Sequence, residues 1–288
     1  MYMINYYILS LAGKDYMTSL DMPISMSGIL ASCTPIAVTI FGFAYSQWTN
    51  CSYYWPFIYT SVMSILGNAL YFSALTYQSP VMVFIGRFCT GMGGARVIAR
   101  RYMADNVSVA ARTRFSVTFV AVSTLGTAAG PICGGLLTLI DETEFAGFIV
   151  NKVTAPALAM LVLWLIYLVL VLVFFKEPPI PVRESVSAKE SLRCKAMIPT
   201  YFCGWNLFFG KLIQESVLTT APIVCYLFFD WDAAWVGLFM GILNLLAVPC
   251  NFIVGGVSKH VPDRVFILTS WISTTIAVAL LIVYEWPM

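Results

Sequence analysis

Residues 86–106 read GRFCTGMGGARVIARRYMADN and place four arginines and four glycines in a stretch that is otherwise largely apolar. An arginine near the middle of a bilayer costs at least about 2.5–3.5 kcal/mol. Glycines, having no side chain, let neighbouring helices approach closely. The stretch therefore predicts a membrane helix that lies between other helices and a polar cavity instead of facing lipid.

The composition of the whole chain agrees with a membrane protein. Of its 288 residues, 60% are hydrophobic and 10% are charged, and the mean hydropathy is +0.84, whereas soluble domains are about 25% charged. The net charge of +2 gives no reason to expect a nucleic acid partner. Motifs of hydrolases, zinc proteases and nucleotide-binding loops are absent, and His260 is the one histidine. We expect no enzyme activity, no catalytic residue, no metal site and no cofactor.

The hydrophobic pattern divides into eight segments long enough to cross a bilayer, which takes about 20 residues. They are residues 25–46, 55–76, 80–103, 114–140, 154–175, 197–221, 232–256 and 265–285. Residues 1–12 are too few to span, so we interpret them as the end of a ninth helix that begins before Met1. The alternative is a signal peptide ending at Leu11-Ala12-Gly13.

Loop charges predict which ends of the helices face the cytosol. With nine spans, ten cations fall on one side and two on the other, and the cation-rich side is predicted to be cytosolic. The two are Lys14 and Lys152, and the ten are Arg101, Arg112, Arg114, Lys176, Arg183, Lys189, Arg193, Lys195, Lys259 and Arg264.

A polar stretch and a weak repeat predict two halves. Residues 176–195, KEPPIPVRESVSAKESLRCK, read as a solvated linker. Pro35 and Gly42 recur as Pro249 and Gly256, each 214 residues later (249 − 35 = 214). We expect an N-terminal six-helix half over residues 1–175 with its first helix incomplete, a cytosolic linker over 176–196, and a partial second half of three helices over 197–288.

The helical period separates the charged residues of the opening stretch into two stripes. At 100° per residue, one stripe holds Arg87, Gly91 and Gly94, and the opposite one holds Arg96 and Arg100. For Arg87 and Arg96 we weigh a cavity or charge-relay role against a structural buried pair. For Arg101, near the cytosolic end, the structural reading is snorkelling or an ion pair with Asp105.

Two later spans also carry candidate functional residues. Residues 114–140 contain Gly130 and Pro131 within a run of small residues, which indicates either tight packing or a hinge. Residues 197–221 contain Lys211 and Glu215 one turn apart. This pair either neutralises itself or makes Glu215 a titratable coupling group that faces the cavity of the arginines.

The stretch from Gly86 to Asp105 resembles the fourth helix of major facilitator carriers. More specifically, Gly93-Gly94-Ala95-Arg96 followed by Arg100-Arg101-Tyr102 and Asp105 resembles the transporter portion of the SPX–MFS vacuolar phosphate transporters. Further likeness lies in Glu215-Ser216 with Thr219-Thr220, and in Pro249-x-Asn251-x-Ile253-Val254-Gly255. The 288 residues contain no SPX domain. The loop SQWTNCSYY, residues 46–54, has no charge where facilitator carriers usually have an acid and several bases.

The resemblance implies an all-α polytopic membrane bundle of the major facilitator type, with about nine of twelve spans present. It implies a secondary active transporter of a small anion, inorganic phosphate or similar, that works by alternating access in a vacuolar or lysosomal membrane, with a coupling ion possible. Two alternatives stay open: a lysosomal facilitator carrier for another solute, and a truncated membrane protein that does not transport.

Site roles follow from this reading. Guanidinium groups match phosphate oxygens bidentately, so Arg96 and Arg100 are predicted to bind the anion. Charge relay or coupling is assigned to Arg87, Lys211 and Glu215, and gating or packing to Gly91, Gly94, Gly130 and Pro131.

Overall fold

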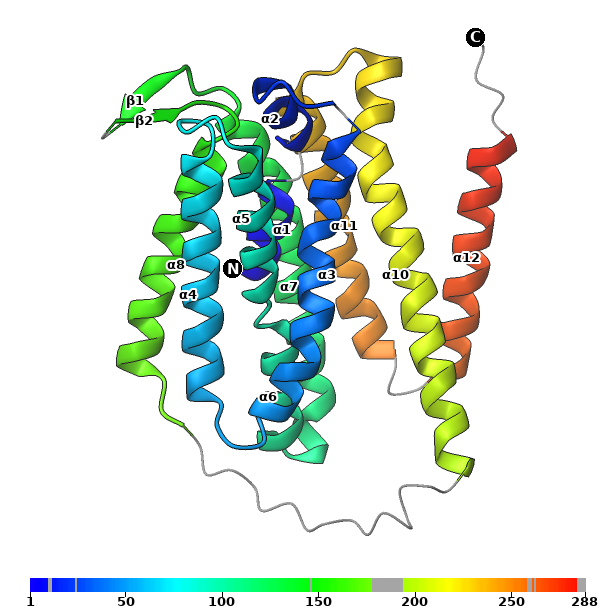
Figure 1. Cartoon of the computed structure of the whole chain (residues 1–288). Helices are drawn as coiled ribbons and strands as arrows, with labels where there is room; N and C mark the ends of the chain where they lie inside the picture. Colours follow the sequence, from blue (N-terminus) through cyan, green and yellow to red (C-terminus); the bar gives the residue numbers. More distant parts are fainter. Residues whose placement is uncertain are drawn as a thin grey trace.

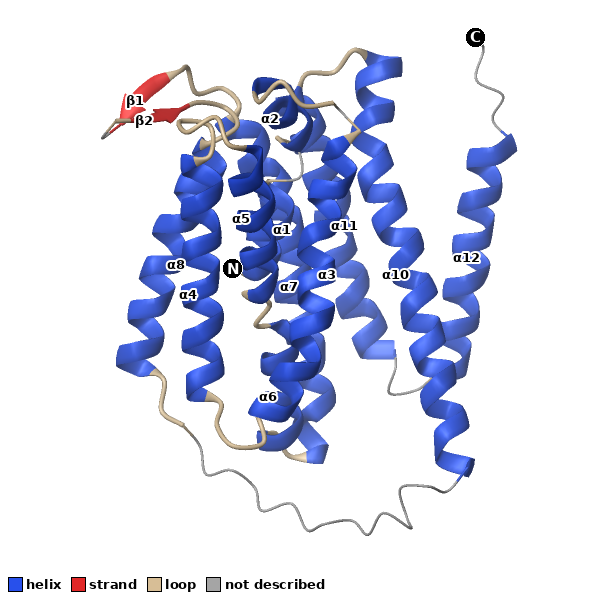
Figure 2. Ribbon diagram, in the orientation of Figure 1, coloured by secondary structure: helices blue, strands red, loops and turns tan. Residues whose placement is uncertain are grey.

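A bundle of long, roughly parallel helices makes up most of the computed structural model (Figures 1 and 2). The structure describes residues 1–9, 12–23, 25–145, 147–177, 194–257, 261 and 263–283. Its helices are α1 Tyr2–Ile8, α2 Gly13–Ser19, α3 Met26–Trp48, α4 Tyr54–Ser73, α5 Pro80–Met92, α6 Arg96–Asn106, α7 Val109–Leu137, α8 Ala155–Phe174, α10 Cys194–Phe229, α11 Ala233–Val257 and α12 Asp263–Val283.

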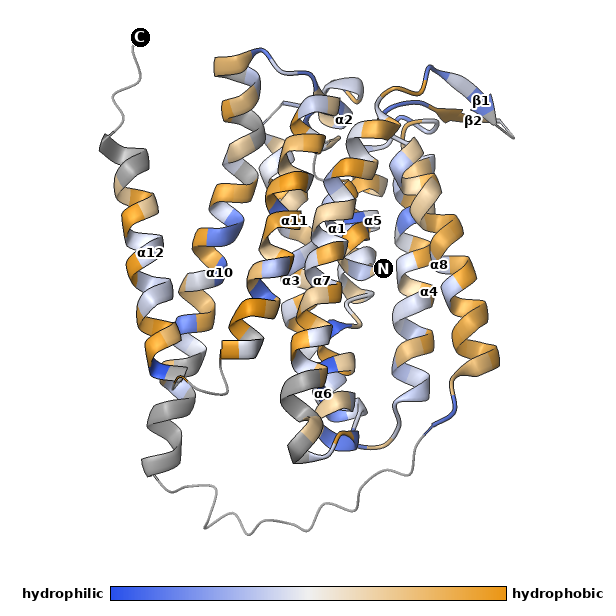
Figure 3. Cartoon of the chain, turned by 180° about the vertical axis from the view of Figure 1, so that it is seen from behind, coloured by the Kyte–Doolittle hydropathy of each residue, from blue (hydrophilic) through white to orange (hydrophobic). Residues whose placement is uncertain are grey.

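Helices form most of each of the eight predicted spans within the described residues, so the all-α membrane bundle is confirmed. Within the described ranges, five helical stretches are long and apolar enough to cross a membrane by themselves: Met26–Trp48, Pro80–Asn106, Phe115–Leu137, Ala155–Phe174 and Ala233–Val254. Seen from behind, α8 is strongly apolar (Figure 3). Its exposed side chains include Val169 and Val173, as expected for a helix that faces lipid.

The third span differs from the single helix that the sequence predicted. Helix α5 ends at Met92 and α6 begins at Arg96, with Gly93, Gly94 and Ala95 between them. Consecutive glycines weaken a helix because glycine loses more conformational entropy than other residues when it is ordered, and because it has no side chain to pack. The angular stripes therefore hold within α5 and within α6, but not across the break.

Two further short elements were not predicted. The chain continues after α1 into α2, where the sequence had suggested a single helix end at residues 1–12. Strands β1 Thr143–Phe145 and β2 Phe148–Val150 form an antiparallel hairpin between α7 and α8. Gly147, at φ +81°, supplies the turn conformation that other residues rarely adopt.

Glycines allow several of the helix crossings. A Cβ built on Gly91 of α5 would lie 2.5 Å from the carbonyl oxygen of Thr34 in α3. One built on Gly130 of α7 would lie 2.8 Å from Cβ of Tyr7 in α1. A Cβ on Gly94 would lie 3.3 Å from a methyl group of Val38. Pro131 lies inside the continuous helix α7. The three glycines thus lie where α5, the α5–α6 break and α7 closely approach α3 or α1.

The two ends of the bundle carry different loops. Helix α2 and the hairpin lie at one end, whereas α6 and the first turns of α10 lie at the other (Figure 1). Lys152 and Asp15 pair at the first end, with 3.3 Å between Nζ and Oδ2. Of the predicted cytosolic cations, Arg101 and Lys176 lie at the second end, Arg101 in the middle of α6 and Lys176 just after the C-terminal end of α8.

The helices form two groups in chain order, a first group of α1–α8 and a second group of α10–α12. The second group packs on the first through α11. Helices α7 and α11 make the most extensive helix contact, and Asn251 Nδ2 donates to Thr124 Oγ1 at 3.1 Å. Pro35 and Pro249, the repeated prolines, both lie inside long helices, α3 and α11. Helix α10 continues beyond residue 221 to Phe229 because the sequence there is again apolar. Most of the predicted linker, residues 178–193, lies outside the described residues, so the division into domains stays a prediction.

Candidate functional site

The break between α5 and α6 places a helix N-terminus inside the third span. Helix α6 starts at Arg96, and no side chain in the described part of the protein caps it. The first N–H groups of a helix have no partners within the helix, and the helix dipole makes that end partly positive. Arg96 adds a guanidinium group at the same place. The start of α6 thus combines two features that favour an anion.

Arg96 lines an open cavity of about 210 Å³ that five helices border. Its walls come from α1, α4, α6, α7 and α8, and include Tyr2, Phe119, Ser123 and Trp164. The buried Nε of Arg96 has no hydrogen-bond partner among the described residues. The cavity is therefore mostly aromatic and apolar, with a cation whose donor is unused.

Trp164 brings a second unused donor to the same cavity. Its side chain is 1% exposed, and its indole N–H, on Nε1, finds no acceptor in the described part of the chain. A buried donor without an acceptor costs about 1–3 kcal/mol. Two such donors beside one cavity suit a ligand that carries hydrogen-bond acceptors and negative charge.

Arg87 is buried more deeply than Arg96. Its side chain is 4% exposed, and Nη1 has no hydrogen-bond partner within the described ranges. Tyr2, Tyr6 and Tyr71 lie within its electrostatic range. No ion pair with a described carboxylate accompanies it, so the structure does not supply the acidic partner that a structural buried pair would need.

Glu215 connects α10 with α1. Tyr7 donates a hydrogen bond from its hydroxyl to Glu215 Oε1 at 3.0 Å. Lys211 Nζ lies 3.6 Å from the same oxygen and donates to Gln214 at 2.8 Å. Glu215 also interacts electrostatically with Arg96. The ion pair within α10 is thus present, and the same carboxylate is close enough to Arg96 for the two charges to attract each other.

Arg100 lies one turn beyond Arg96 but lines a different cavity. This second cavity, of about 300 Å³, lies between α6 and α7, and its lining includes Met103, Ser116 and Phe119. The guanidinium carbon of Arg100 lies 5.9 Å from the ring centroid of Phe119. Arg96 and Arg100, which we expected to bind one anion, are therefore assigned to separate cavities.

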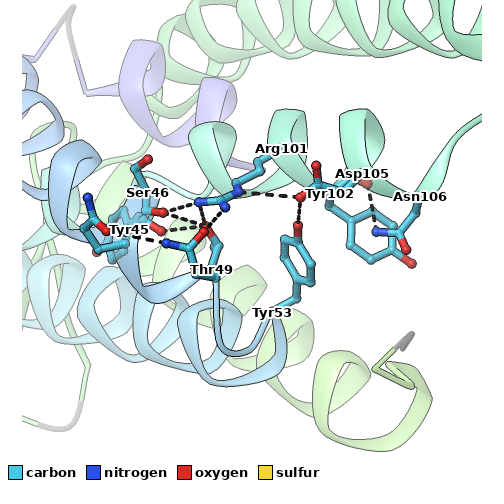
Figure 4. Close-up of polar contacts among 10 residues, drawn as sticks. Tyr45, Ser46, Thr49, Tyr53, Arg101, Tyr102, Asp105 and Asn106 are labelled. Carbon is cyan, nitrogen blue, oxygen red and sulfur yellow. Dashed lines mark hydrogen bonds and ion pairs between the residues drawn. The ribbon is translucent and has the colours of Figure 1, made fainter. Parts of the chain in front are cut away.

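Arg101 is held at the end of the bundle by a polar network (Figure 4). It donates to the Ser46 carbonyl, to Thr49 Oγ1 at 2.7 Å and to Asn50. Its Nε lies 3.6 Å from Asp105 Oδ2, so the predicted ion pair is confirmed. Tyr53 donates to the same carboxylate oxygen at 2.5 Å. The uncharged end of α3 and the loop after it are thus joined to α6 by hydrogen bonds that Arg101 donates to neutral acceptors.

Sequence reasoning missed two parts of this arrangement. It treated the third span as one helix and so overlooked the N-terminus of α6, although the pair Gly93-Gly94 indicates the break. It also gave no role to Trp164, which reads as one apolar residue among many in α8. No pattern in the sequence distinguishes an indole that lacks an acceptor.

Comparison with known proteins agrees with the fold. A family model described as Major Facilitator Superfamily matches residues 1–288. An SPX domain-containing membrane protein of Oryza sativa subsp. japonica is 29% identical over 336 residues, which covers 97% of this chain and 48% of the relative. Two SPX domain-containing membrane proteins of Arabidopsis thaliana are 28% and 26% identical, covering 97% and 94% of this chain and 48% and 46% of the relatives. No solved structure shows a significant match.

The chain belongs to the Major Facilitator Superfamily, a family of membrane transporters. It is a multi-pass integral membrane protein, and the resemblance to SPX–MFS proteins is confirmed. The chain spans about half the length of the curated relatives it matches.

Proposed function

We propose that the protein takes part in the transport of a small anion, inorganic phosphate or a close analogue, by alternating access, and that the anion binds at the N-terminus of α6. The observation that carries the proposal is the meeting of three features at one cavity. These are the uncapped start of α6, the unpartnered Nε of Arg96 and the unpartnered indole N–H of Trp164.

The chemistry of these groups favours a tetrahedral oxyanion. Broken membrane helices in transporters direct their N-terminal ends at anionic groups of the substrate. A guanidinium group offers donors in a planar fork that matches two phosphate oxygens. Since the anion has several acceptor oxygens, one ion can accept from Arg96, from Trp164 and from the amides of α6.

Charge relay is proposed for Arg87, Lys211 and Glu215. Among the described residues, the carboxylate of Glu215 attracts the guanidinium of Arg96. Tyr7 donates a hydrogen bond to the same carboxylate. An anion that enters beside Arg96 would weaken the attraction between Arg96 and Glu215. This coupling supports a role for Glu215 in binding a coupling cation or proton. A vacuolar or lysosomal membrane remains the proposed location.

The proposal is tested by binding and uptake in parallel. Equilibrium binding of radiolabelled phosphate to the purified chain is measured beside counterflow uptake into proteoliposomes, with Arg96→Gln as the matched variant. We expect saturable binding that Arg96→Gln abolishes, with sulfate as a weaker competitor. Binding without uptake would favour the alternative of a membrane protein that does not transport. Equal phosphate binding by the wild-type protein and by Arg96→Gln would show that Arg96 is not part of the binding site.

A further inference from the structure

The cavity beside Arg100 has features of a site that the proposed function does not use. Arg96 and Arg100 are separated by one helical turn, a rise of about 6 Å, yet each lines its own cavity. Phe119 of α7 lines both cavities. Its ring therefore forms part of the wall between the two arginines.

Arg100 is an exposed residue, and its guanidinium makes no hydrogen bond or ion pair with the described residues. The next residue, Arg101, is used fully by Asp105, Thr49 and the end of α3. Arg100 instead lies over the aromatic ring of Phe119. A ring contact leaves the edge of the guanidinium plane, which carries its N–H donors, free for a ligand.

The walls of this cavity combine one cation with one hydroxyl and apolar surface. Ser116 can donate or accept a hydrogen bond, while Met103, Phe119 and Val120 are apolar. A volume of about 300 Å³ is at the lower end of the range for small-ligand pockets. The cavity lies towards the cation-rich end of the bundle, where α6 leads to Arg101. Such a mixture suits a phosphate group, either free or on an anionic lipid.

We propose that Arg100, Ser116 and Phe119 form an outer subsite for a phosphate group, separated by Phe119 from the inner cavity at Arg96. The proposal builds on the proposed function, because it takes a phosphate group as the ligand class. Its two sources, inorganic phosphate and the headgroup of an anionic lipid, share the chemistry that Arg100 recognises.

The test is protection of arginine side chains in the wild-type chain. The purified chain in phosphatidylcholine nanodiscs is treated with phenylglyoxal, and mass spectrometry measures modification at each arginine. One arm adds inorganic phosphate, and another replaces part of the lipid by phosphatidylglycerol. We expect modification of Arg100 to fall at least about tenfold in one of these arms. Arg264, an exposed arginine of α12, is the control and should change less than about twofold.

Two variants separate the outer subsite from the inner one. Arg96→Gln should leave protection of Arg100 intact. Ser116→Phe, at an exposed position, should fill the outer cavity and remove protection of Arg100 while sparing that of Arg96. Loss of Arg100 protection in Arg96→Gln would show one shared site and overturn the proposal. So would retained protection in Ser116→Phe, protection of Arg264 to the same degree, or no protection of Arg100 in either arm.

The same data separate this proposal from the proposed function. If phosphate protects Arg100 but never Arg96, the outer subsite stands and the inner anion site fails. If phosphate protects Arg96 but neither arm protects Arg100, the proposed function stands and the outer subsite fails.

Discussion

Tyr7 in α1 donates its hydroxyl hydrogen bond to Glu215 in α10 across 3.0 Å, joining residues that are 208 positions apart in the chain. This bond links the first and second groups of helices at a carboxylate that also pairs with Lys211. Glu215 is thus held by one group from each side of the interface. The contact gives direct tests of how the two groups of helices are fastened together.

Replacing Tyr7 by phenylalanine removes the donor and keeps the ring. A hydrogen bond to a charged group is worth about 1.5–3 kcal/mol, and partial exposure of Glu215 places the effect near the lower end. We expect Tyr7→Phe to lower the free energy of unfolding by about 1.5 kcal/mol, measured by thermal unfolding in detergent. Tyr226→Phe removes a hydroxyl that makes no hydrogen bond with the described residues and serves as the control. Equal stability of Tyr7→Phe and wild type would show that the bond contributes nothing.

Gly91 should not tolerate a methyl group. The added Cβ would lie 2.5 Å from the Thr34 carbonyl oxygen and 2.7 Å from Cβ of Ala37, and backbone atoms of α3 cannot move aside cheaply. Gly91→Ala should therefore destabilise the fold by about 1–3 kcal/mol. Gly210→Ala is the matched control, since nothing lies within 4 Å of its added Cβ. An unchanged unfolding temperature for Gly91→Ala would contradict the close contact between α3 and α5.

Arg101 should be irreplaceable by lysine. Its planar fork serves the Ser46 carbonyl, Thr49 and Asn50 together, and it also faces Asp105. A lysine keeps the charge but cannot donate in this geometry. We expect Arg101→Lys to speed hydrogen exchange of the amides in residues 49–53. It should also lower the free energy of unfolding by about 1–2 kcal/mol. Arg264→Lys, at an exposed arginine, should leave the same amides unaffected.

Acid should loosen the start of α4. Glu177 accepts from the amides of Tyr53 and Tyr54 at 2.6 and 3.4 Å, which places a negative charge at a helix N-terminus. Burial alone would raise the pKa of Glu177, but the hydrogen bonds from Ser52, Tyr53 and Tyr54 hold that pKa below its ordinary value. A lowered pKa stabilises the folded form above the unfolded pKa, and this contribution is lost as pH falls through the folded pKa.

The measurement is hydrogen exchange at the amides of Tyr53 and Tyr54, corrected for the intrinsic effect of pH. Protection should be complete near pH 6 and should fall below about pH 4, under the ordinary glutamate pKa. In Glu177→Gln it should be weaker at pH 6 and independent of pH. A wild-type profile that matches the variant would eliminate Glu177 as the cap.

The predicted sidedness can be tested through two glycosylation sequons. Asn50-Cys51-Ser52 and Asn106-Val107-Ser108 both lie at the cation-rich end, which we assign to the cytosol. Neither should carry a glycan when the chain is expressed in a eukaryotic cell. Sequons engineered into the hairpin near Gly147 provide the positive control. A shift in mobility of the unmodified chain on glycosidase treatment would reverse the orientation.

The fold was accessible from the sequence because its causes are local. Runs of apolar residues define the helices. Arginines and lysines in the loops predict which ends of the helices share one side of the membrane. The site was accessible only in part. The identity of Arg96 as a candidate came from its charge within an apolar span, but its position at a helix start depended on whether Gly93-Gly94 breaks the helix. The separation of Arg96 from Arg100 depends on where Phe119 of α7 lies, and periodicity within one helix cannot supply a contact made by another.

The central claim, that an anion binds beside Arg96 at the start of α6, is tested most directly by the affinity of Arg96→Lys for phosphate. Lysine keeps the positive charge and loses the bidentate fork. The dissociation constant, measured by equilibrium binding to folded protein, should rise about 5- to 150-fold, which corresponds to about 1–3 kcal/mol. Lys152→Arg, a charge-preserving change far from the cavity, should bind like wild type. An unchanged dissociation constant for Arg96→Lys, in protein that folds normally, would contradict the account.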